Sequence, residues 1–332
     1  MSRRLCTLWL ASATLCACLT PTDDIQPTAD VVAVEVDSGS APADDAEMSP
    51  GPEATLRRFG TLNVLRFFDT TCDSGTCGGS AFEPSVSQDQ FDGKARALSR
   101  AIEAMDVNFL MLQEIESEAC MQALQERLGD RYTVAYLAET GAPASADVGV
   151  LAEGQLIDVV LHRQDPILRA DGTTTTFARE FPEVHLTHHG QDIVLMPLHF
   201  RSKYNDDPAR RLAEAEAAQR IATEVAAAHP DAIVVLGGDV NDGIGSPALL
   251  ALEAGGRLEG VYDDLAAHKR WTYDYNSQQQ MIDHLLLARD ATGAWLAGET
   301  RVIREDIVGN WPSDHAGLIA TIHAQSTPND RR

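Results

Sequence analysis

Several apolar runs of this sequence end in a side chain that can bind a metal ion or carry a proton. An amide stands in the first run at Asn63, an acid ends the next at Glu114, and an imidazole ends a later one at His199. Further polar residues flank three later apolar runs: Asp239 with Asn241, Asp283, and Asp314 with His315. Each residue alone is compatible with a cap, a turn or a hydrogen-bonded core position. Their shared place at the ends of predicted strands favours a single cleft.

Hydrolysis of a phosphate ester is the chemistry that such a set suits. Glu114 and Asp314, together with an amide oxygen, offer the oxygen ligands that a hard divalent cation prefers. A bound metal screens the phosphate oxygens and stabilises the leaving alkoxide. His315 paired with Asp283 can take a proton from water near neutral pH. His199 can donate a hydrogen bond to the negative charge that develops on the phosphoryl group.

Short apolar runs and helical periodicity alternate from Leu56 onward, without an internal repeat or a long linker. Strands are predicted at Thr61–Phe67, Asn108–Ile115, Thr133–Ala138, Val148–Ala152, Ile157–His162, Val184–Thr187, Ile193–Phe200, Ala232–Leu236, Ile282–Ala288 and Leu318–His323. Helices are predicted at Gln90–Met105 and Pro208–His229, and another after Glu114. Many strands with few helices predict an α/β fold of two packed sheets flanked by helices.

The charge and cysteine content narrow the classes of function. The 332 residues include 50 acids and 26 Lys or Arg, which gives a net charge of −24. This balance argues against a general nucleic-acid coat or a polybasic membrane binder, so a phosphate ligand needs local cations or a metal. The six cysteines do not have the spacing of a disulfide-stapled small fold or a zinc ribbon.

The first 18 residues have the layout of a signal peptide. Arg3 and Arg4 precede an uncharged apolar run that is too short to span a bilayer. The run Leu15-Cys16-Ala17-Cys18 resembles a lipobox, which predicts acylation of Cys18; simple cleavage near Ala17 is the alternative. We therefore expect an exported protein, either an outer-membrane lipoprotein anchored to the membrane through Cys18 or a periplasmic or extracellular protein.

Three further segments are predicted along the chain. Residues 19–55 contain many acids, no Lys or Arg, and repeated Pro, Ala, Ser and Thr, which is typical of a disordered acidic linker. A short strand at Val31–Val36 is the weaker alternative. Residues 56–325 form one domain, and residues 326–332 form a polar disordered tail.

The polar motifs also resemble those of a known family. In chain order they are Asn63, Gln113-Glu114, His199, Gly238-Asp239-Val240-Asn241, Ile282-Asp283-His284 and Ser313-Asp314-His315. This series resembles the endonuclease/exonuclease/phosphatase superfamily, which includes pancreatic-type deoxyribonuclease, over residues 56–323. The resemblance implies a four-layer α/β/β/α sandwich of two mixed β-sheets flanked by helices, with the site at one edge of the sheets. It also implies Mg²⁺ or Mn²⁺ as cofactor, with Ca²⁺ as a candidate structural ion.

The same resemblance suggests a role for each residue. Glu114 corresponds to the principal metal carboxylate, with Asn63 and Asp314 completing that site. Asp239 and Asn241 correspond to the pair that holds the nucleophilic water and contacts the phosphate. Two imidazoles and one further acid complete the set: His315 as general base or proton carrier, Asp283 as its orienting group, and His199 as a phosphate-binding histidine. Leu65 stands where relatives that repair abasic DNA carry an additional acid, which argues against that activity.

The segment after His199 is similar to one in secreted bacterial members described as extracellular nucleases. There the chain continues Phe200-Arg201-Ser202-Lys203. Arg201 and Lys203 are predicted to bind phosphate oxygens, with ordinary surface cations as the alternative.

Cys72 and Cys77 lie in a Gly-rich loop shortly after Asn63. An exported protein permits a disulfide between them, and two free or metal-binding thiols are the alternative.

Together these features predict an exported, divalent-metal-dependent phosphodiester hydrolase, a monomeric nuclease that cleaves DNA or RNA by in-line attack of water. A phosphatase or phospholipid-type phosphodiesterase on the same scaffold is the alternative, because the catalytic residues handle only the phosphoryl group. A surface-displayed binding protein without activity is a third hypothesis. Buried carboxylates without a cation or proton would destabilise such a protein, which argues against it.

Overall fold

The computed structural model describes residues 56–304 and 309–323. The predicted signal peptide, the lipidation site Cys18, the acidic linker and the C-terminal tail lie outside these residues. None of the described helices is long and apolar enough to cross a membrane.

The first sheet has seven strands and is mixed. In spatial order they are β15 (Ala294–Trp295), β17 (Gly317–His323), β1 (Leu56–Phe67), β2 (Phe109–Ile115), β4 (Asp147–Ala152) and β3 (Val134–Ala138), and β16 (Arg301–Ile303) also pairs with β17. Strands β1 and β2 run parallel, whereas the other pairs are antiparallel.

The second sheet has six strands and is also mixed. Their order is β11 (Leu258–Gly260), β14 (Asp283–Ala288), β10 (Ile233–Asp239), β9 (Gln191–His199), β8 (Pro182–His188) and β5 (Gln155–Leu161). Strands β9 and β10 are parallel. Two small hairpins stand apart from the large sheets: β6 (Ile167–Leu168) with β7 (Thr174–Thr175), and β12 (Tyr273–Tyr275) with β13 (Gln278–Gln280).

Helices connect the strands. They are α1 (Gln88–Met105), α2 (Glu118–Leu128), α3 (Pro208–Ala228) and α4 (Pro247–Leu252), with short 3₁₀ helices η1 (Gly129–Arg131), η2 (Ala254–Gly256), η3 (Tyr262–Asp264) and η4 (Ala267–Lys269). Helix α1 begins at a capping box in which Ser87 and Gln90 satisfy each other's backbone N–H groups. Helix α3 begins at the Asp207 cap, followed by proline in its first turn.

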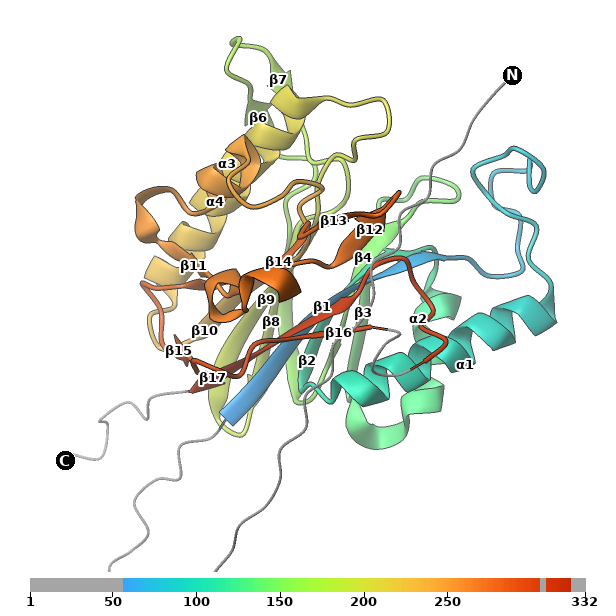
Figure 1. Cartoon of the computed structure of the whole chain (residues 1–332), viewed down its shortest axis with the longest axis horizontal. Coiled ribbons are helices and arrows are strands. Elements are labelled where there is room, and N and C mark those ends of the chain that lie inside the picture. Colours follow the sequence, from blue (N-terminus) through green and yellow to red (C-terminus); the bar gives the residue numbers. More distant parts are fainter. Residues whose placement is uncertain (1–55, 305–308, 324–332) are drawn as a thin grey trace, which may run out of the picture. The chain divides into compact units, whose positions relative to one another are not determined.

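Three apolar clusters define the layers. One packs α1 and α2 on the first sheet, a second fills the space between the sheets, and a third packs α3 and α4 on the second sheet. Alternation along β10 builds two of them, because Ile233 and Val235 face the first sheet while Val234 and Leu236 face α3. Figure 1 shows α1 and α2 on one side of the strands and α3 and α4 on the other. These layers confirm the predicted four-layer α/β/β/α sandwich.

Candidate active site

The second sheet places three polar side chains in one row. Asp239 ends β10 and pairs directly with His199 at the end of β9 and with Asp283 at the start of β14. Directly paired residues on neighbouring strands project to the same face of a sheet. Strand pairing therefore brings together residues that lie 40 to 84 positions apart along the chain.

The first sheet contributes Asn63 and Glu114 through an irregularity in β1 and β2. The register shifts between Asn63 and Phe67, and Glu114 has a positive φ of 67°. Leu65 and Arg66 also have positive φ, a conformation that costs free energy in residues other than glycine. Their backbone N–H groups turn toward the site, where Leu65 donates to Asn63 Oδ1 (3.0 Å) and Arg66 to Glu114 Oε2 (2.9 Å).

Asn63 joins the two sheets. Its Nδ2 donates to Glu114 Oε1 (3.1 Å) within the first sheet and to Asp239 Oδ2 (3.2 Å) across the gap. The Asn63 side chain is fully buried, so its amide has no access to bulk water. A single amide thus holds two carboxylates from different sheets at a fixed separation.

An imidazole–carboxylate couple faces the same point. His315 Nδ1 lies 2.8 Å from Asp283 Oδ2, which leaves Nε2 directed toward Asp239, 3.9 Å from its Oδ2. His199 Nε2 approaches that oxygen from the other side, at 3.7 Å. Tyr273 packs on the His315 ring with 4.7 Å between ring centroids.

Hydrogen bonds also fix the segment that carries His315. Ser313 Oγ donates to the Asn63 carbonyl (2.7 Å) and accepts the His315 N–H (3.1 Å). The Ala316 N–H donates to the Thr272 carbonyl, and Thr272 Oγ1 accepts the Asp283 N–H. The segment is therefore tied to β1 on one side and to the start of β14 on the other.

Asn241 closes the end of β10. Its N–H donates to Asp239 Oδ1 (2.7 Å), and its Nδ2 donates to the Phe200 carbonyl (3.1 Å). The positive φ of 56° at Asn241 is tolerated better by asparagine than by most residues. This turn orients the Asp239 carboxylate and keeps the Asn241 amide beside it.

Asp314 is placed differently from the other predicted metal ligands. It is exposed, and within the described residues it makes no hydrogen bond or ion pair with Asn63 or Glu114. Its charge nevertheless acts on His315 and on Lys94 of α1. Asp239, Asp283 and His315 instead offer possible ligand atoms that all lie within 4.8 Å of one another.

The two predicted phosphate-binding cations contact the loops after β9 and β10. Arg201 donates through Nη2 to the carbonyls of Tyr204 (3.2 Å) and Asn205 (2.9 Å). Lys203 Nζ lies 3.1 Å from Asp242 Oδ1. Neither side chain makes a described contact with the carboxylates of the site.

Arg179 is a site residue that sequence analysis missed. It lies between β7 and β8, and its charge acts on His199, Asp239 and Glu114. Among the described residues Arg179 has no carboxylate within ion-pair distance. The only sequence signal was an Arg-Glu pair inside the otherwise apolar run Phe177-Ala178-Arg179-Glu180-Phe181-Pro182.

Glu214 of α3 positions two of these segments. Its side chain is fully buried, and its two oxygens accept the N–H groups of Ala178 (2.7 Å) and Arg201 (2.7 Å). Ala178 precedes Arg179, and Arg201 follows the β9 end that carries His199. The helical periodicity of α3 gave no indication of this buried acid.

Electrostatics couple the central groups. Burial raises the pKa of Asp239, and the nearby Asp283 and Glu114 charges raise it further, against the opposing effect of His315. Burial lowers the pKa of His315, but Asp283, Asp239 and Asp314 outweigh burial and raise it to about 10. Burial, with the Arg179 and His315 charges, holds the pKa of His199 well below its usual range.

The donor set fits a hard divalent cation. Asp239, Glu114 and Asp283 concentrate negative charge around one point, and Asn63 donates through Nδ2 to two of these carboxylates while its Oδ1 accepts the Leu65 N–H. Within the described residues, Asp283 Oδ1 is buried without a hydrogen-bond partner. Carboxylate and amide oxygens are the ligands that Mg²⁺, Mn²⁺ and Ca²⁺ prefer.

The fold and this site define an α/β sandwich with a carboxylate and imidazole centre at the sheet edges. The model of the endonuclease/exonuclease/phosphatase family matches residues 60–315, and the chain belongs to this family. Its members are hydrolases that act on phosphoric ester bonds, and its nucleases generally use divalent metals such as Mg²⁺. The predicted family is confirmed, whereas the likeness to secreted bacterial nucleases stays a prediction. No curated protein matches the chain in sequence.

Solved structures with the same fold support this assignment. TDP2 from D. rerio, in complex with a single-strand DNA product, is 18% identical, with 81% of this chain and 99% of that chain covered and a TM-score of 0.57. The human Nocturnin catalytic domain with a bound sulfate anion is 14% identical, with 81% and 95% covered and a TM-score of 0.56. TDP2 from Caenorhabditis elegans is 15% identical, with 81% and 75% covered and a TM-score of 0.55.

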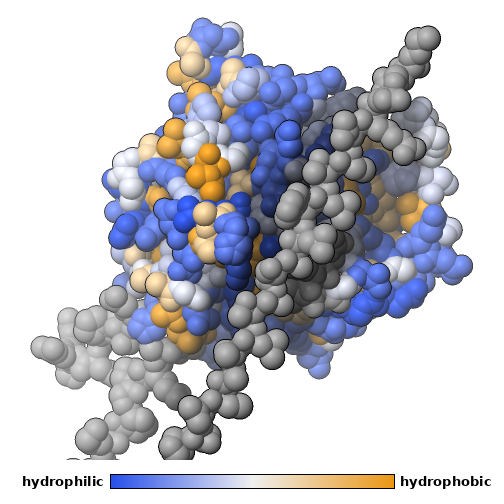
Figure 2. Space-filling view, in the orientation of Figure 1, coloured by the Kyte–Doolittle hydropathy of each residue, from blue (hydrophilic) through white to orange (hydrophobic). Residues whose placement is uncertain are grey.

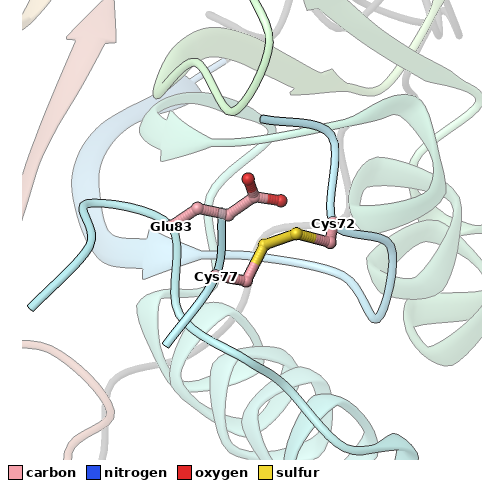
Figure 3. Close-up of side chains that lie close together, drawn as sticks. All are labelled: Cys72, Cys77 and Glu83. Atoms are coloured by element: carbon pink, nitrogen blue, oxygen red, sulfur yellow. A yellow bond between two sulfur atoms is a disulfide. The ribbon is translucent and has the colours of Figure 1, made fainter. Parts of the chain in front are cut away.

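The loop between β1 and α1 contains the pair Cys72 and Cys77. The structure joins them in a disulfide with 6.0 Å between Cα atoms, so the thiols do not form a metal site. Figure 3 shows the carboxylate of Glu83 beside this disulfide.

Proposed function

We propose that this protein is an exported, divalent-metal-dependent phosphodiesterase that hydrolyses nucleic acid. One observation carries the proposal: Asn63 binds Glu114 and Asp239 at once, opposite the His315–Asp283 couple. Family membership supports phosphodiester chemistry. The structure of the D. rerio protein in complex with single-strand DNA supports a nucleic-acid substrate for a chain of this fold.

Glu114 and Asp239 are the residues that would hold the metal ion, with Asn63 fixing their separation and Asp283 and exposed Asp314 near enough to contribute charge. A bound Mg²⁺ or Mn²⁺ would neutralise charge on the phosphate and on the leaving oxygen. This set adds Asp239 to the ligands predicted from sequence and gives Asp314 a more distant role.

Proton transfer follows from the pKa directions. The pKa of His315 is raised, so its imidazolium is favoured at neutral pH and Nε2 can donate a proton to the leaving oxygen. The pKa of Asp239 is also raised, which makes its carboxylate a better acceptor for the proton of an attacking water. Asp283 binds Nδ1 and thereby keeps Nε2 of His315 directed at the reaction.

Two further residues suit the transition state. His199 is held neutral and can donate one hydrogen bond to a phosphoryl oxygen without adding a charge near Arg179. Arg179 has no carboxylate partner within the described residues, so its guanidinium is available for the phosphate. Glu214 orders the backbone beside Arg179 and beyond His199.

Export is part of the proposal. The basic and apolar start of the chain supports it, and the Cys72–Cys77 disulfide is consistent with an oxidising compartment. A mass spectrum of the mature N-terminus tests it: loss of residues 1–17 with a lipid mass on Cys18 supports a lipoprotein, simple cleavage supports a periplasmic or extracellular protein, and an uncleaved N-terminus contradicts export.

A substrate panel tests the activity. The purified mature chain is incubated with plasmid DNA, RNA, bis(p-nitrophenyl) phosphate, p-nitrophenyl phosphate and sphingomyelin, with Mg²⁺ or Mn²⁺ and with EDTA. We expect cleavage of nucleic acid and of the small diester that EDTA abolishes. Preferential cleavage of the monoester or of sphingomyelin would replace the nuclease assignment, and no cleavage of any substrate would favour a binding protein.

A further inference from the structure

A cavity of about 220 Å³ lies between the loop after β1 and the first half of α1. Its walls include Arg66, Phe68, Pro84, Phe91 and Lys94. None of these five was part of the predicted site. Figure 2 shows hydrophobic surface, in orange, on the side of the molecule where α1 begins.

The cavity adjoins the proposed active site. Arg66 donates its backbone N–H to Glu114 Oε2 at 2.9 Å, so the residue that begins the cavity wall also orients a proposed metal ligand. Lys94, on the α1 wall, is close enough for the charges of Glu114 and Asp314 to act on its ammonium group. A substrate that extends from the catalytic carboxylates toward Arg66 and Lys94 therefore enters the cavity.

The cavity opens beside a pair of aromatic rings that contact the Arg66 side chain. The Arg66 guanidinium lies 4.6 Å from the ring centroid of Phe82 and 5.6 Å from that of Phe68. The two rings meet edge to face at 5.8 Å. Phe68 is buried, but Phe82 is 56% exposed, so part of its surface is open to a ligand.

The two cations of this region lack carboxylate partners. Within the described residues the Arg66 guanidinium makes only its aromatic contacts, and Lys94 Nζ donates to the Pro312 carbonyl at 2.6 Å. By contrast, Lys203 in the loop after β9 is paired with Asp242. In a chain with a net charge of −24, such unpaired cations beside the active site provide a local binding surface for an anion.

The disulfide loop holds the outer wall in place. The buried Glu83 carboxylate accepts the N–H groups of Asp73 (2.7 Å) and Ser74 (2.8 Å), within the loop that Cys72 and Cys77 close. Figure 3 shows this carboxylate against the disulfide. The chain then passes directly from Glu83 to the cavity wall at Pro84.

We propose that this region, formed by Arg66, Phe68, Phe82 and Lys94, is a subsite for the nucleotide next to the scissile phosphate of a single nucleic-acid strand. The base stacks on the exposed Phe82–Arg66 face, and the flanking phosphate binds Arg66 and Lys94. Stacking on aromatic and guanidinium planes accepts any base, so the subsite binds strands without sequence preference. The inference rests on the proposed function and names its substrate class.

Kinetics on two substrates test the subsite in the full mature chain. The variants are Phe82→Ala and Arg66→Ala, compared on a single-stranded oligonucleotide and on bis(p-nitrophenyl) phosphate, which has no neighbouring nucleotide. We expect KM for the oligonucleotide to rise about tenfold to a hundredfold in both variants, and kcat/KM for the small diester to stay within twofold of wild type in Phe82→Ala, whose side chain is not part of the proposed metal site. Arg66→Lys keeps the charge but loses the planar face, so its KM for the oligonucleotide should lie between those of wild type and Arg66→Ala.

Matched controls separate this effect from changes in charge or exposed apolar surface. Arg301→Ala removes an exposed arginine of β16, and Leu168→Ala shortens an exposed apolar side chain of β6. Both control variants are expected to cleave both substrates with the kinetic constants of wild type. Unchanged oligonucleotide KM in Phe82→Ala and Arg66→Ala, or equal losses on both substrates in Phe82→Ala, would contradict the subsite.

A binding measurement keeps the subsite testable if the nuclease assignment fails. Fluorescence anisotropy of a labelled 12-nucleotide oligothymidylate, in Ca²⁺ without turnover, measures affinity directly. Weaker binding by Phe82→Ala without any hydrolysis by wild type would retain the subsite and reject the enzyme. Equal binding by wild type and both variants would reject the subsite even if wild type cleaves nucleic acid.

Discussion

Two clusters of imidazole and carboxylate groups lie in this domain, and they differ in burial and in how their polar atoms are satisfied. One is the active-site cluster of Asp239, Asp283, His315 and His199. The other joins β5 to β8 and is referred to here as the β5–β8 cluster: His162 Nε2 lies 2.6 Å from Glu183 Oε1, and His185 Nε2 lies 2.9 Å from Glu183 Oε2.

The imidazole and carboxylate groups of the β5–β8 cluster bond to one another. Both oxygens of Glu183 have an imidazole partner, and the second nitrogen of His162 contacts Asp165 at 2.8 Å. Burial raises the pKa of Glu183, but its histidine partners outweigh burial and lower it to about 2. The Glu183 hydrogen bond raises the pKa of His162. Each group thus favours the charged form of the other, as expected of a structural ion pair.

The active-site cluster has fewer partners than polar atoms. Among the described residues, His199 Nδ1 and Asp283 Oδ1 are buried without hydrogen bonds. Burial pushes Asp239 and His199 toward their neutral forms, in contrast to Glu183 and His162. Left-handed backbone at Glu114 and Asn241 adds strain. Unsatisfied atoms, shifted pKa values and strain together mark a binding site, whereas histidine and acid content alone does not.

The largest effect is expected from Glu114→Gln. The substitution keeps the size of the side chain and removes a charge from the proposed metal site. We expect kcat to fall by about 10³-fold or more, since a catalytic metal contributes several kcal/mol to the transition state. Initial rates on bis(p-nitrophenyl) phosphate measure it, and circular dichroism checks the fold. Activity within tenfold of wild type would contradict the metal assignment.

His315→Ala compares the two clusters directly. Loss of the proton donor is expected to lower kcat about 10²- to 10⁴-fold. His185→Ala removes an imidazole of the β5–β8 cluster and serves as the matched control, with activity within about twofold of wild type. Equal losses in both variants would show that the clusters do not divide into catalytic and structural roles.

His162→Asn is expected to alter stability rather than activity. The lowered pKa of Glu183 stabilises the fold above pH 4.5, and this contribution is lost as the pH falls toward 2. The raised pKa of His162 stabilises the fold below about pH 6.5 and is lost as the pH rises above that. The Glu183 shift corresponds to about 3 kcal/mol at most.

Urea unfolding from pH 3 to 9 measures this contribution. The free energy of unfolding of wild type should be highest between about pH 5 and 6.5, and His162→Asn should reduce this maximum. His189→Asn is the control, because His189 is exposed and has a positive φ that asparagine tolerates. Coincident pH curves for wild type and His162→Asn would contradict the structural role of the pair.

The smallest effect is metal-dependent stabilisation. The concentrated carboxylates of the active site repel one another, so Mg²⁺ at about ten times its Kd should stabilise the fold by about 1.4 kcal/mol, or about 3 to 6 °C in Tm. EDTA should reverse the shift. Glu114→Gln should reduce it, while His185→Ala should retain it. A shift of equal size in Glu114→Gln would place the metal elsewhere.

Local patterns of the sequence predicted most of the large strands and three of the four α-helices. The predicted strand at Val184–Thr187 lies inside β8, and the helix at Pro208–His229 ends one residue beyond α3. Alternation and helical periodicity depend only on nearby positions in the sequence, so they can be recognised without knowing which residues are neighbours in space. Strands of two or three residues, such as β15 and β16, have too few positions to alternate and were missed.

For the site, the sequence by itself determined which chemistry was available and on which strand ends it stood. Tertiary structure alone decided that Asn63 bridges Glu114 to Asp239, that Asp314 stays exposed, and that Arg179 lies with them. It also decided that Glu214 orders the backbone around the site from inside a helix. These facts depend on contacts between residues distant in the chain, and only strand pairing and sheet packing create those contacts.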